Sequence, residues 1–278
     1  TRAAAGMLSP AFEIFHEKPD LAHRQVLHDA LGLWDTNATL LADDPYRSFG
    51  YRRDGVYGIG FSCDLANSKP VAADDRFGFF TEAPGVCVQG EGVVEPDALR
   101  GLLYALAKKA GVRIVNGQAR RGDGPTLTID GETMGAHTLI VTAGVASDPE
   151  VTPVRGRALL MRLDPEDRAA VPTVVRSPRV YFCPRRDNLV YIGATEEWPE
   201  DDARGSLDAL MAEALRLLPC LKRAQLVSKF DGLRPFVGRS GPRIDWADER
   251  VLVAFGHHRN GVLLAPWTAQ RISDLLGL

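Results

Sequence analysis

Residues 251–261 read VLVAFGHHRNG, and this stretch is the strongest indication of the fold class of the chain. The first five residues form an apolar run typical of a strand buried on both faces. Glycines at positions 256 and 261 bracket a tight turn, and residues 262–276 follow with the spacing of a helix. A strand, turn and helix in this order present free backbone N–H groups that bind negative charge. The pattern alone leaves open whether a ligand binds, because many α/β proteins contain such a turn without one.

The remainder of the chain alternates helical and strand patterns. Helices are predicted by apolar spacing and end signals over residues 20–42, 97–109 and 206–218. Strands are predicted over 112–115, 138–142, 158–163, 180–184, 189–194 and 225–233, with short strands between 44 and 91 and a hairpin over 126–133. We expect the run at 138–142 to be buried on both faces. The fold class predicted is a mixed α/β fold in which a nucleotide-binding domain is interleaved with an antiparallel sheet.

Composition excludes several classes of function. The net charge is -3 with a pI near 6.1, and the basic clusters, such as residues 185–186, are short. We therefore expect neither nucleic acid nor a membrane as a partner. The four cysteines have no CxxC spacing, so we expect reduced thiols, a cytoplasmic protein and no metal site.

Four segments resemble FAD-dependent oxidases of the D-amino-acid oxidase family, in particular the glycine oxidases of thiamine biosynthesis. Residues 256–266, GHHRNGVLLAP, resemble the carboxy-terminal flavin-contacting motif of that branch, with a His at 258 where most members have Phe. Residues 3–8, AAAGML, resemble the stretch that passes beside the flavin. Residues 181–195 resemble the substrate-face hairpin, and residues 232–235, GLRP, resemble the motif that supplies the substrate arginine.

The resemblance implies roles for individual residues. Arg234 would hold the carboxylate of an amino acid, since a guanidinium binds a carboxylate bidentately and stays charged. Tyr181 would add a hydroxyl to the same carboxylate, and Arg259 would line the site. Without the motif, each residue has an ordinary alternative interpretation. Arg234 would be one half of a structural ion pair, and Tyr181 would be an amphipathic strand residue. The implied FAD-contacting positions are Ala4, Ala5, Gly6, Met7, Val115, Thr142, Ala143, Gly144, Gly256, His257, His258, Arg259, Asn260, Gly261, Val262 and Leu263.

The implied reaction is hydride transfer from the α-carbon of glycine or another small amino acid to FAD. The imino acid is then hydrolysed, and dioxygen reoxidises the flavin to give hydrogen peroxide; the reaction would feed thiamine thiazole synthesis. Two alternatives stay open: a dehydrogenase that passes electrons to a partner subunit, and a flavin-free binding protein. His257 and His258 are interpreted as packing and hydrogen-bonding residues. The resemblance also implies a homo-oligomer.

The family's domains would divide this chain into discontinuous parts. Residues 1–12, 92–154 and 225–278 would form the FAD-binding Rossmann-like domain, and residues 13–91 and 155–224 the substrate-binding domain. No GxGxxG occurs in the sequence, so the first βαβ unit, which holds the pyrophosphate in this family, is not recognised. We expect that unit to precede residue 1 in the natural chain. Two alternatives are that a second polypeptide supplies the unit and that the protein is a true truncation.

Overall fold

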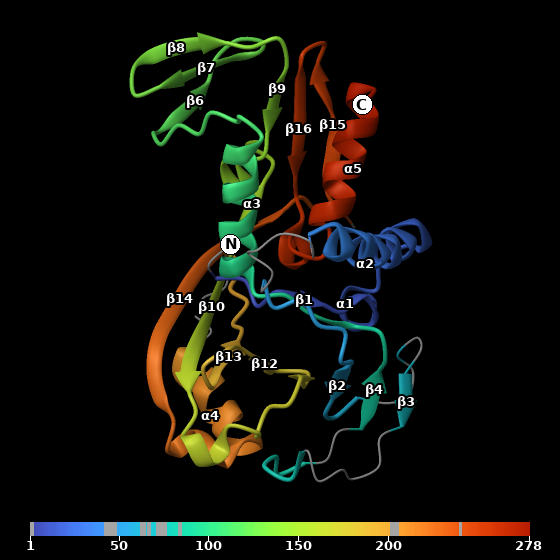
Figure 1. The fold of residues 1–278 in the computed structure, drawn as a ribbon, viewed down its shortest axis with the longest axis vertical. Coiled ribbons are helices and arrows are strands. Elements are labelled where there is room, and N and C mark those ends of the chain that lie inside the picture. The colour runs from blue at the N-terminus through green and yellow to red at the C-terminus, as the bar shows by residue number, and fades with distance from the viewer. Residues whose placement is uncertain are drawn as a thin grey trace.

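Two sheets joined by two long strands form the frame of the molecule (Figure 1). The computed structural model describes residues 3–41, 49–61, 65, 68–70, 77–82, 85–200, 206–238 and 241–278. Within them, an eight-stranded sheet has the order β14-β10-β13-β12-β11-β2-β4-β3. Its strands are β2 Val56–Gly58, β3 Ser68–Pro70, β4 Val86–Val88, β10 Thr152–Arg162, β11 Val174–Arg176, β12 Tyr181–Pro184, β13 Leu189–Gly193 and β14 Gln225–Phe236.

The second sheet is smaller and lies at the opposite end of the molecule (Figure 1). It has the order β15-β16-β9, in which β16 runs antiparallel to β15 and parallel to β9. Its strands are β9 Leu139–Val141, β15 Arg243–Asp248 and β16 Val251–Phe255. Beside it lies a meander of β6 Ala119–Arg121, β7 Thr126–Ile129 and β8 Glu132–Gly135. All five residues of β16 are buried, which confirms the prediction for residues 251–255.

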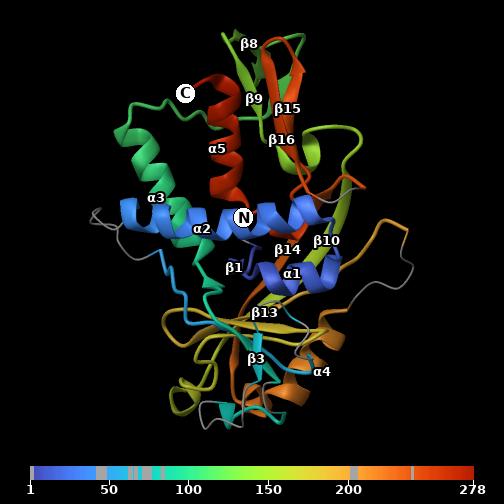
Figure 2. The same ribbon diagram turned by 90° about the vertical axis from the view of Figure 1, so that its right-hand side faces the viewer.

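Helices lie beside the large sheet, between the two sheets and beside the small sheet (Figures 1 and 2). The helices are α1 Pro10–Glu17, α2 Leu21–Leu41, α3 Pro96–Lys109, α4 Leu207–Leu217 and α5 Ala265–Leu276. In Figure 2, α2 crosses the middle of the molecule between the two sheets. Its apolar side packs with residues of α3 and of the turn before α5. A two-stranded pair of β1 Met7–Leu8 and β5 Gly92–Val93 lies beside α1.

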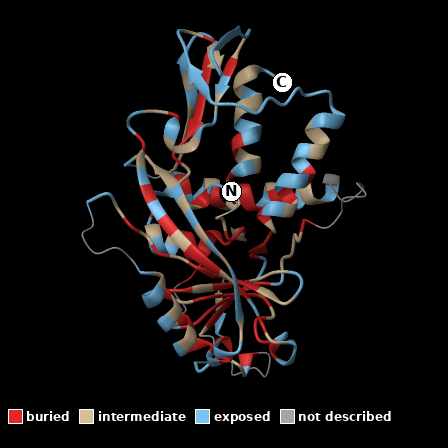
Figure 3. Cartoon of the chain, turned by 90° about the vertical axis from the view of Figure 1, so that its left-hand side faces the viewer, coloured by how far each residue is buried: buried red, intermediate tan, exposed pale blue. Residues whose placement is uncertain are grey.

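The buried side chains concentrate on both faces of the eight-stranded sheet (Figure 3). One face packs against α4, whose Ser206 cap accepts a hydrogen bond from the Ala209 N–H. The other face packs against α1 and Ala5. The end of the molecule that carries β6–β9 is largely exposed (Figure 3). The domain boundaries stay a prediction, since β10 and β14 run between both ends and α2 packs on α3 and α5.

Most predicted elements are present, including the hairpin that turns at Asp130 and Gly131, both with positive φ. Three expectations were wrong. Residues 112–115 form no strand, because no strand among the described residues lies beside them, and Val115 is 46% exposed. The run at 138–142 is not buried on both faces, since β9 is an edge strand and Ile140 is 39% exposed. The final helix begins at Ala265 rather than 262, because a 3₁₀ turn, η5 His258–Asn260, precedes it.

Candidate active site

Strand register brings the predicted substrate residues to one face of the eight-stranded sheet. Tyr181 on β12 lies opposite Gly193 on β13, and Gly193 lies opposite Ala158 on β10. On the far side of β10, Val154 pairs with Arg234 of β14. Side chains two residues apart share a face, so Tyr181 and Arg234 lie on the face that α1 covers.

Two glycines provide the space in which these side chains lie. A Cβ at Gly193 would be 2.5 Å from the Tyr181 hydroxyl, and a Cβ at Gly156 would overlap the Arg234 guanidinium. Neither glycine has a positive φ, so their role is the absence of a side chain. Tyr181 and Arg234 therefore lie flat against a hollow in the sheet.

Tyr181 is part of an aromatic row across this face. Its ring is stacked on Tyr191 at a centroid distance of 6.3 Å, and Tyr191 is stacked on Phe230 at 5.4 Å. Burial raises the pKa of Tyr181 to about 12, although the charges of Arg234 and Arg259 lower it. The hydroxyl is therefore protonated at neutral pH and able to donate a hydrogen bond.

Arg234 has no carboxylate within 4 Å among the described residues. Among the described residues its guanidinium donates to main-chain oxygens alone: Nη1 and Nη2 each lie 3.2 Å from the Thr195 carbonyl, and Nη1 lies 3.4 Å from that of Arg155. A buried or half-buried guanidinium without a counter-ion attracts an anion. The geometry thus leaves Arg234 able to accept a carboxylate.

Arg259, in contrast, is already neutralised. Its Nη2 lies 2.7 Å from Glu196 Oε2, and its Nε lies 3.8 Å from Glu13 Oε2. Burial lowers the pKa of Arg259, but the carboxylates of Glu13 and Glu196 outweigh that effect and raise it. The structure thus brings Arg259 to the same neighbourhood as Tyr181, whose pKa responds to its charge, but pairs it with carboxylates.

A buried charged pair under α1 supports this neighbourhood. Glu13 Oε1 lies 2.7 Å from Arg176 Nη1, and both side chains are less than 10% exposed. Burial raises the pKa of Glu13, but the charges of Arg176 and Arg259 outweigh it, so the pKa lies below its ordinary value. Sequence reasoning missed Glu13, Arg176 and Glu196. Only Glu196 carried a signal, because it directly follows the resemblance segment that ends at Thr195.

The turn after β16 is held by contacts of its polar side chains. His257 Nε2 lies 2.8 Å from the Thr268 hydroxyl of α5, and burial lowers the pKa of His257 to about 4. His258 Nδ1 and Asn260 Nδ2 lie 3.4 and 3.3 Å from the carboxylate oxygens of Glu17. Both histidines thus make packing and hydrogen-bonding contacts in this structure, and the His257 ring is neutral at physiological pH.

Backbone N–H groups at the same turn fit an anionic or electron-rich ligand edge. Those of Gly261, Val262 and Leu263 have no acceptor among the described residues. The Leu263 carbonyl accepts a hydrogen bond from the Trp34 indole, which fixes the turn against α2. Gly256 has φ +84° and a Cβ there would meet Val237, so this glycine is required by packing as well as by conformation. These observations fit the carbonyl edge of a flavin ring.

The segment Ala3–Met7 crosses the site face. The Tyr191 hydroxyl donates to the Ala3 carbonyl at 2.6 Å, and Arg185 donates to the carbonyl of Ala5. Gly6 has φ +78°, and a Cβ there would overlap the Val94 carbonyl. The small residues expected from the sequence thus serve partly to bring β1 against β5.

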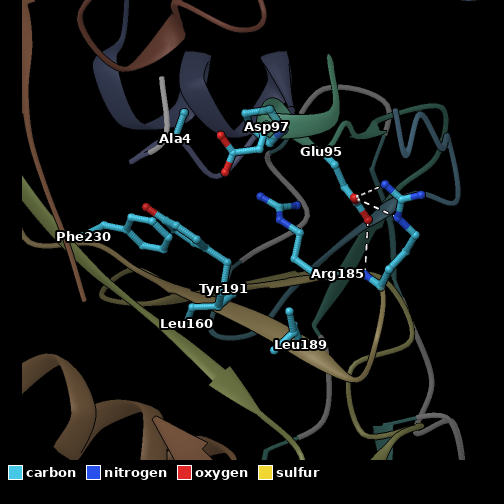
Figure 4. Close-up of a pocket in the computed structure, with 10 residues that line it drawn as sticks. Ala4, Glu95, Asp97, Leu160, Arg185, Leu189, Tyr191 and Phe230 are labelled. Carbon is cyan, nitrogen blue, oxygen red and sulfur yellow. Dashed lines mark hydrogen bonds and ion pairs between the residues drawn. The ribbon is translucent and has the colours of Figure 1, made fainter. Parts of the chain in front are cut away.

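A cavity of about 170 Å³ adjoins this segment. Figure 4 shows Tyr191 and Phe230 side by side below Ala4, with Arg185 pointing towards the same space. Asp97 at the start of α3 lies on the opposite side, and Glu95 pairs with Arg186 at the rim. The cavity therefore lies on the same sheet face as Tyr181 and Arg234, near Leu160 of β10.

The remaining predicted cofactor residues lie farther up the molecule. Thr142, Ala143 and Gly144 follow β9. Because β9 and β16 are parallel, these residues lie at the same end of the small sheet as the turn at 256–261. Val115 is not part of this sheet: it lies in the exposed segment between α3 and β6.

Other classes of site find no support in the part of the chain that the structure describes. There, no cluster of three His, Cys, Asp or Glu residues could hold a metal ion. Cys87, Cys183 and Cys220 are buried free thiols, and Cys63 lies outside the described residues. None of the described helices is long and apolar enough to cross a membrane.

Comparisons with a family model and with curated proteins agree on one family. The model of the FAD dependent oxidoreductase family, DAO, matches residues 1–275. The bifunctional protein ThiO/ThiG of Synechocystis is 28% identical over 99% of this chain and 45% of its own length. A glycine oxidase of Geobacillus kaustophilus is 29% identical over 84% of this chain and 66% of its own. The chain thus spans about half to two thirds of these curated relatives.

Solved structures agree on the fold. The crystal structure of the Geobacillus kaustophilus glycine oxidase superposes with a TM-score of 0.81 at 21% identity, over 99% of this chain and 84% of the other. Iminodiacetate oxidase from Chelativorans superposes with a TM-score of 0.85 at 18% identity, over 99% and 85%. At these identities the likeness shows a common mixed α/β fold.

Proposed function

The chain belongs to the DAO family of FAD-dependent oxidoreductases, and from that premise we propose that it oxidises glycine or another small amino acid. The observation that carries the proposal is the state of Arg234. It is a guanidinium without a carboxylate partner among the described residues, lying against the same sheet face as the protonated Tyr181 hydroxyl. Together they form a seat for one carboxylate. The similarity to glycine oxidases supports the choice of a small amino acid.

The chain's residues would bind and orient this substrate. Arg234 would hold the carboxylate bidentately, and Tyr181 would donate to one of its oxygens. The glycines at 156 and 193 keep both groups flat, which leaves room above the sheet for a small substrate. When bound, FAD would accept the hydride of the α-carbon and pass two electrons to dioxygen, giving hydrogen peroxide and an imino acid that water hydrolyses.

The residues present fit one end of that cofactor. The N–H groups of Gly261, Val262 and Leu263 would face the flavin carbonyl edge, and Ala4 and Ala5 would flank the ring. This end would be shaped by Gly256, His257, His258, Arg259 and Asn260, together with Gly6 and Met7. The nucleotide end would be faced by Thr142, Ala143 and Gly144.

The nucleotide end needs a further structural unit. The edge of β9 pairs with no strand in the described part of the chain, and Ile140 is 39% exposed beside it. The sequence contains no GxGxxG to bind a pyrophosphate. We propose that this edge receives a further parallel strand that carries such a turn.

The test of the reaction is hydrogen peroxide release on addition of glycine in air. An oxidase releases one peroxide for each glycine consumed, and catalase abolishes the signal. Consumption of glycine with an added electron acceptor but no peroxide would instead identify a dehydrogenase. Absence of both, in a protein that contains FAD, would contradict the proposed substrate.

A role in thiamine synthesis and a cytoplasmic location are part of the same proposal.

A further inference from the structure

Glu196 contacts one arginine of the site with its side chain and follows, in the chain, the residue whose carbonyl contacts the other. It directly follows Thr195, whose carbonyl lies 3.2 Å from both terminal nitrogens of Arg234. Its own Oε2 lies 2.7 Å from Arg259 Nη2. One stretch of two residues therefore places a main-chain oxygen on Arg234 and a carboxylate on Arg259.

The second oxygen of this carboxylate is available. Glu196 Oε1 has no hydrogen-bond partner among the described residues, and the side chain is 27% exposed. The neighbouring Glu197 differs, because it is 8% exposed and bonds to both Arg157 and Thr195. Glu197 is thus tied into the sheet, whereas Glu196 Oε1 is an acceptor without a donor among the described residues.

The charges of the site constrain which substrate fits. Arg259 is balanced by Glu196 and by the buried Glu13, so of these two arginines Arg234 is the one without a carboxylate partner among the described residues. An amino acid held there has its ammonium group one carbon away from its carboxylate. Glu196 is the nearest acidic residue in sequence to the Thr195 contact of Arg234, and an ammonium group is a strong donor to a carboxylate.

We propose that Glu196 selects the charge of the substrate, with Oε2 neutralising Arg259 and Oε1 accepting a hydrogen bond from the substrate ammonium. This inference rests on the proposed function and specifies its substrate class. The site takes zwitterionic amino acids with one carboxylate. It disfavours carboxylates that lack an amine, which gain nothing from Glu196, and it disfavours dicarboxylates, because Glu196 occupies the second arginine.

The test compares Glu196→Gln with the wild type on three probes. Glycine is the zwitterion, glycolate has a hydroxyl in place of the ammonium, and iminodiacetate carries a second carboxylate. The apparent Kd of glycine is the concentration at which the rate of anaerobic flavin bleaching is half of its maximum. The Kd of glycolate comes from the change that its binding makes in the flavin spectrum. Glu200→Gln is the matched control, since Glu200 is an exposed carboxylate four residues further on.

The expected result is a change in preference rather than a general loss. In Glu196→Gln the Kd of glycine rises about tenfold or more, equivalent to one charge-assisted hydrogen bond. The Kd of glycolate stays constant or falls, and kcat/KM for iminodiacetate relative to glycine rises. Glu200→Gln changes none of these.

The outcomes separate the two proposals. An unchanged ratio of glycine to glycolate affinity in Glu196→Gln, in a holoenzyme whose wild type is bleached by glycine, would overturn the role of Glu196 alone. A wild-type holoenzyme that glycine does not bleach would overturn the proposed substrate and this inference with it. A melting temperature equal to that of the wild type shows that the variant is folded.

Discussion

Arg234 is placed by its neighbours as much as by its own backbone. Because Gly156 has no side chain, the guanidinium lies directly over β10, where it meets the carbonyls of Arg155 and Thr195. We expect Gly156→Ala to displace the guanidinium without removing its charge, and to raise KM for glycine about tenfold. Steady-state kinetics measure this. Gly135→Ala, in a strand where a Cβ meets nothing within 4 Å, is the control and leaves KM unchanged.

Removal of the Arg234 charge has a larger effect. Loss of a charge-assisted bidentate pair costs on the order of 1.5–3 kcal/mol, so Arg234→Ala should raise KM by roughly 10- to 100-fold. Arg155→Ala is the matched comparison, because Arg155 is an exposed arginine on the adjacent strand that pairs with Asp231. Equal KM values for the two variants would remove Arg234 from the substrate site.

Glu91 makes the stability of this region depend on pH. It is 2% exposed and accepts the Ala11 N–H of α1 on Oε1, while Oε2 has no partner among the described atoms. Burial raises its pKa from 4.5 to about 8. The folded state therefore holds this proton more tightly than the unfolded chain. The stabilisation is complete below pH 4.5 and is lost as pH rises towards 8.

Glu91→Gln should remove this pH dependence, since a neutral amide keeps the acceptor for Ala11. We expect the variant to be more stable than the wild type by roughly 1–3 kcal/mol at pH 8, and the difference to vanish near pH 4.5. Urea unfolding at several pH values measures it. Parallel stability curves for the two proteins would show that Glu91 is ionised in the folded state.

At the scale of elements, local patterns predict what local forces determine. The stripe of α3 and its ending at Gly111, with φ +81°, follow from residues close in sequence. The same holds for the turn at Asp187 and Asn188 that joins β12 to β13. Residues 112–115 are also rich in β-branched residues, yet a strand requires a neighbour. Local sequence does not specify that neighbour.

The candidate site was only partly predictable for the same reason. Motif resemblance indicates Tyr181, Arg234 and Arg259, but the carboxylates that accompany them come from distant elements. Glu13 lies on α1, more than 240 residues before its neighbour Arg259. Such a contact depends on how α1 packs against the turn after β16, which the periodicity of the sequence does not show.

The open edge of β9 leads to a prediction about one element. If a further strand extends the sheet here and its crossover segment packs on the exposed face of β9, Ile140→Asp places a charge in an apolar contact and should lower FAD retention and stability by about 2 kcal/mol or more. Leu226→Asp, at a similarly exposed position on β14, should cost little. Thermal melting and flavin content of both variants measure this. Equal behaviour would mean that the β9 face is exposed to solvent.

The whole molecule places the candidate site where its two sheets meet. The eight-stranded sheet supplies Tyr181 and Arg234, and the turn that follows the small sheet supplies Arg259 and the free N–H groups. The long strands β10 and β14 join the two ends, with α1 and α2 between them (Figures 1 and 2). In the proposed reaction, this arrangement would bring a substrate bound on the sheet next to a ligand of the turn.

Flavin binding and glycine oxidation are both read from the visible absorption spectrum of the purified, mass-verified protein, recorded before and after anaerobic addition of glycine. We predict flavin bands that bleach with glycine and recover when air is admitted. Flavin bands that persist after addition of glycine would show that the protein binds a flavin and that glycine is not its substrate. A colourless protein that gains no flavin bands on incubation with FAD would contradict both the cofactor and the proposed reaction.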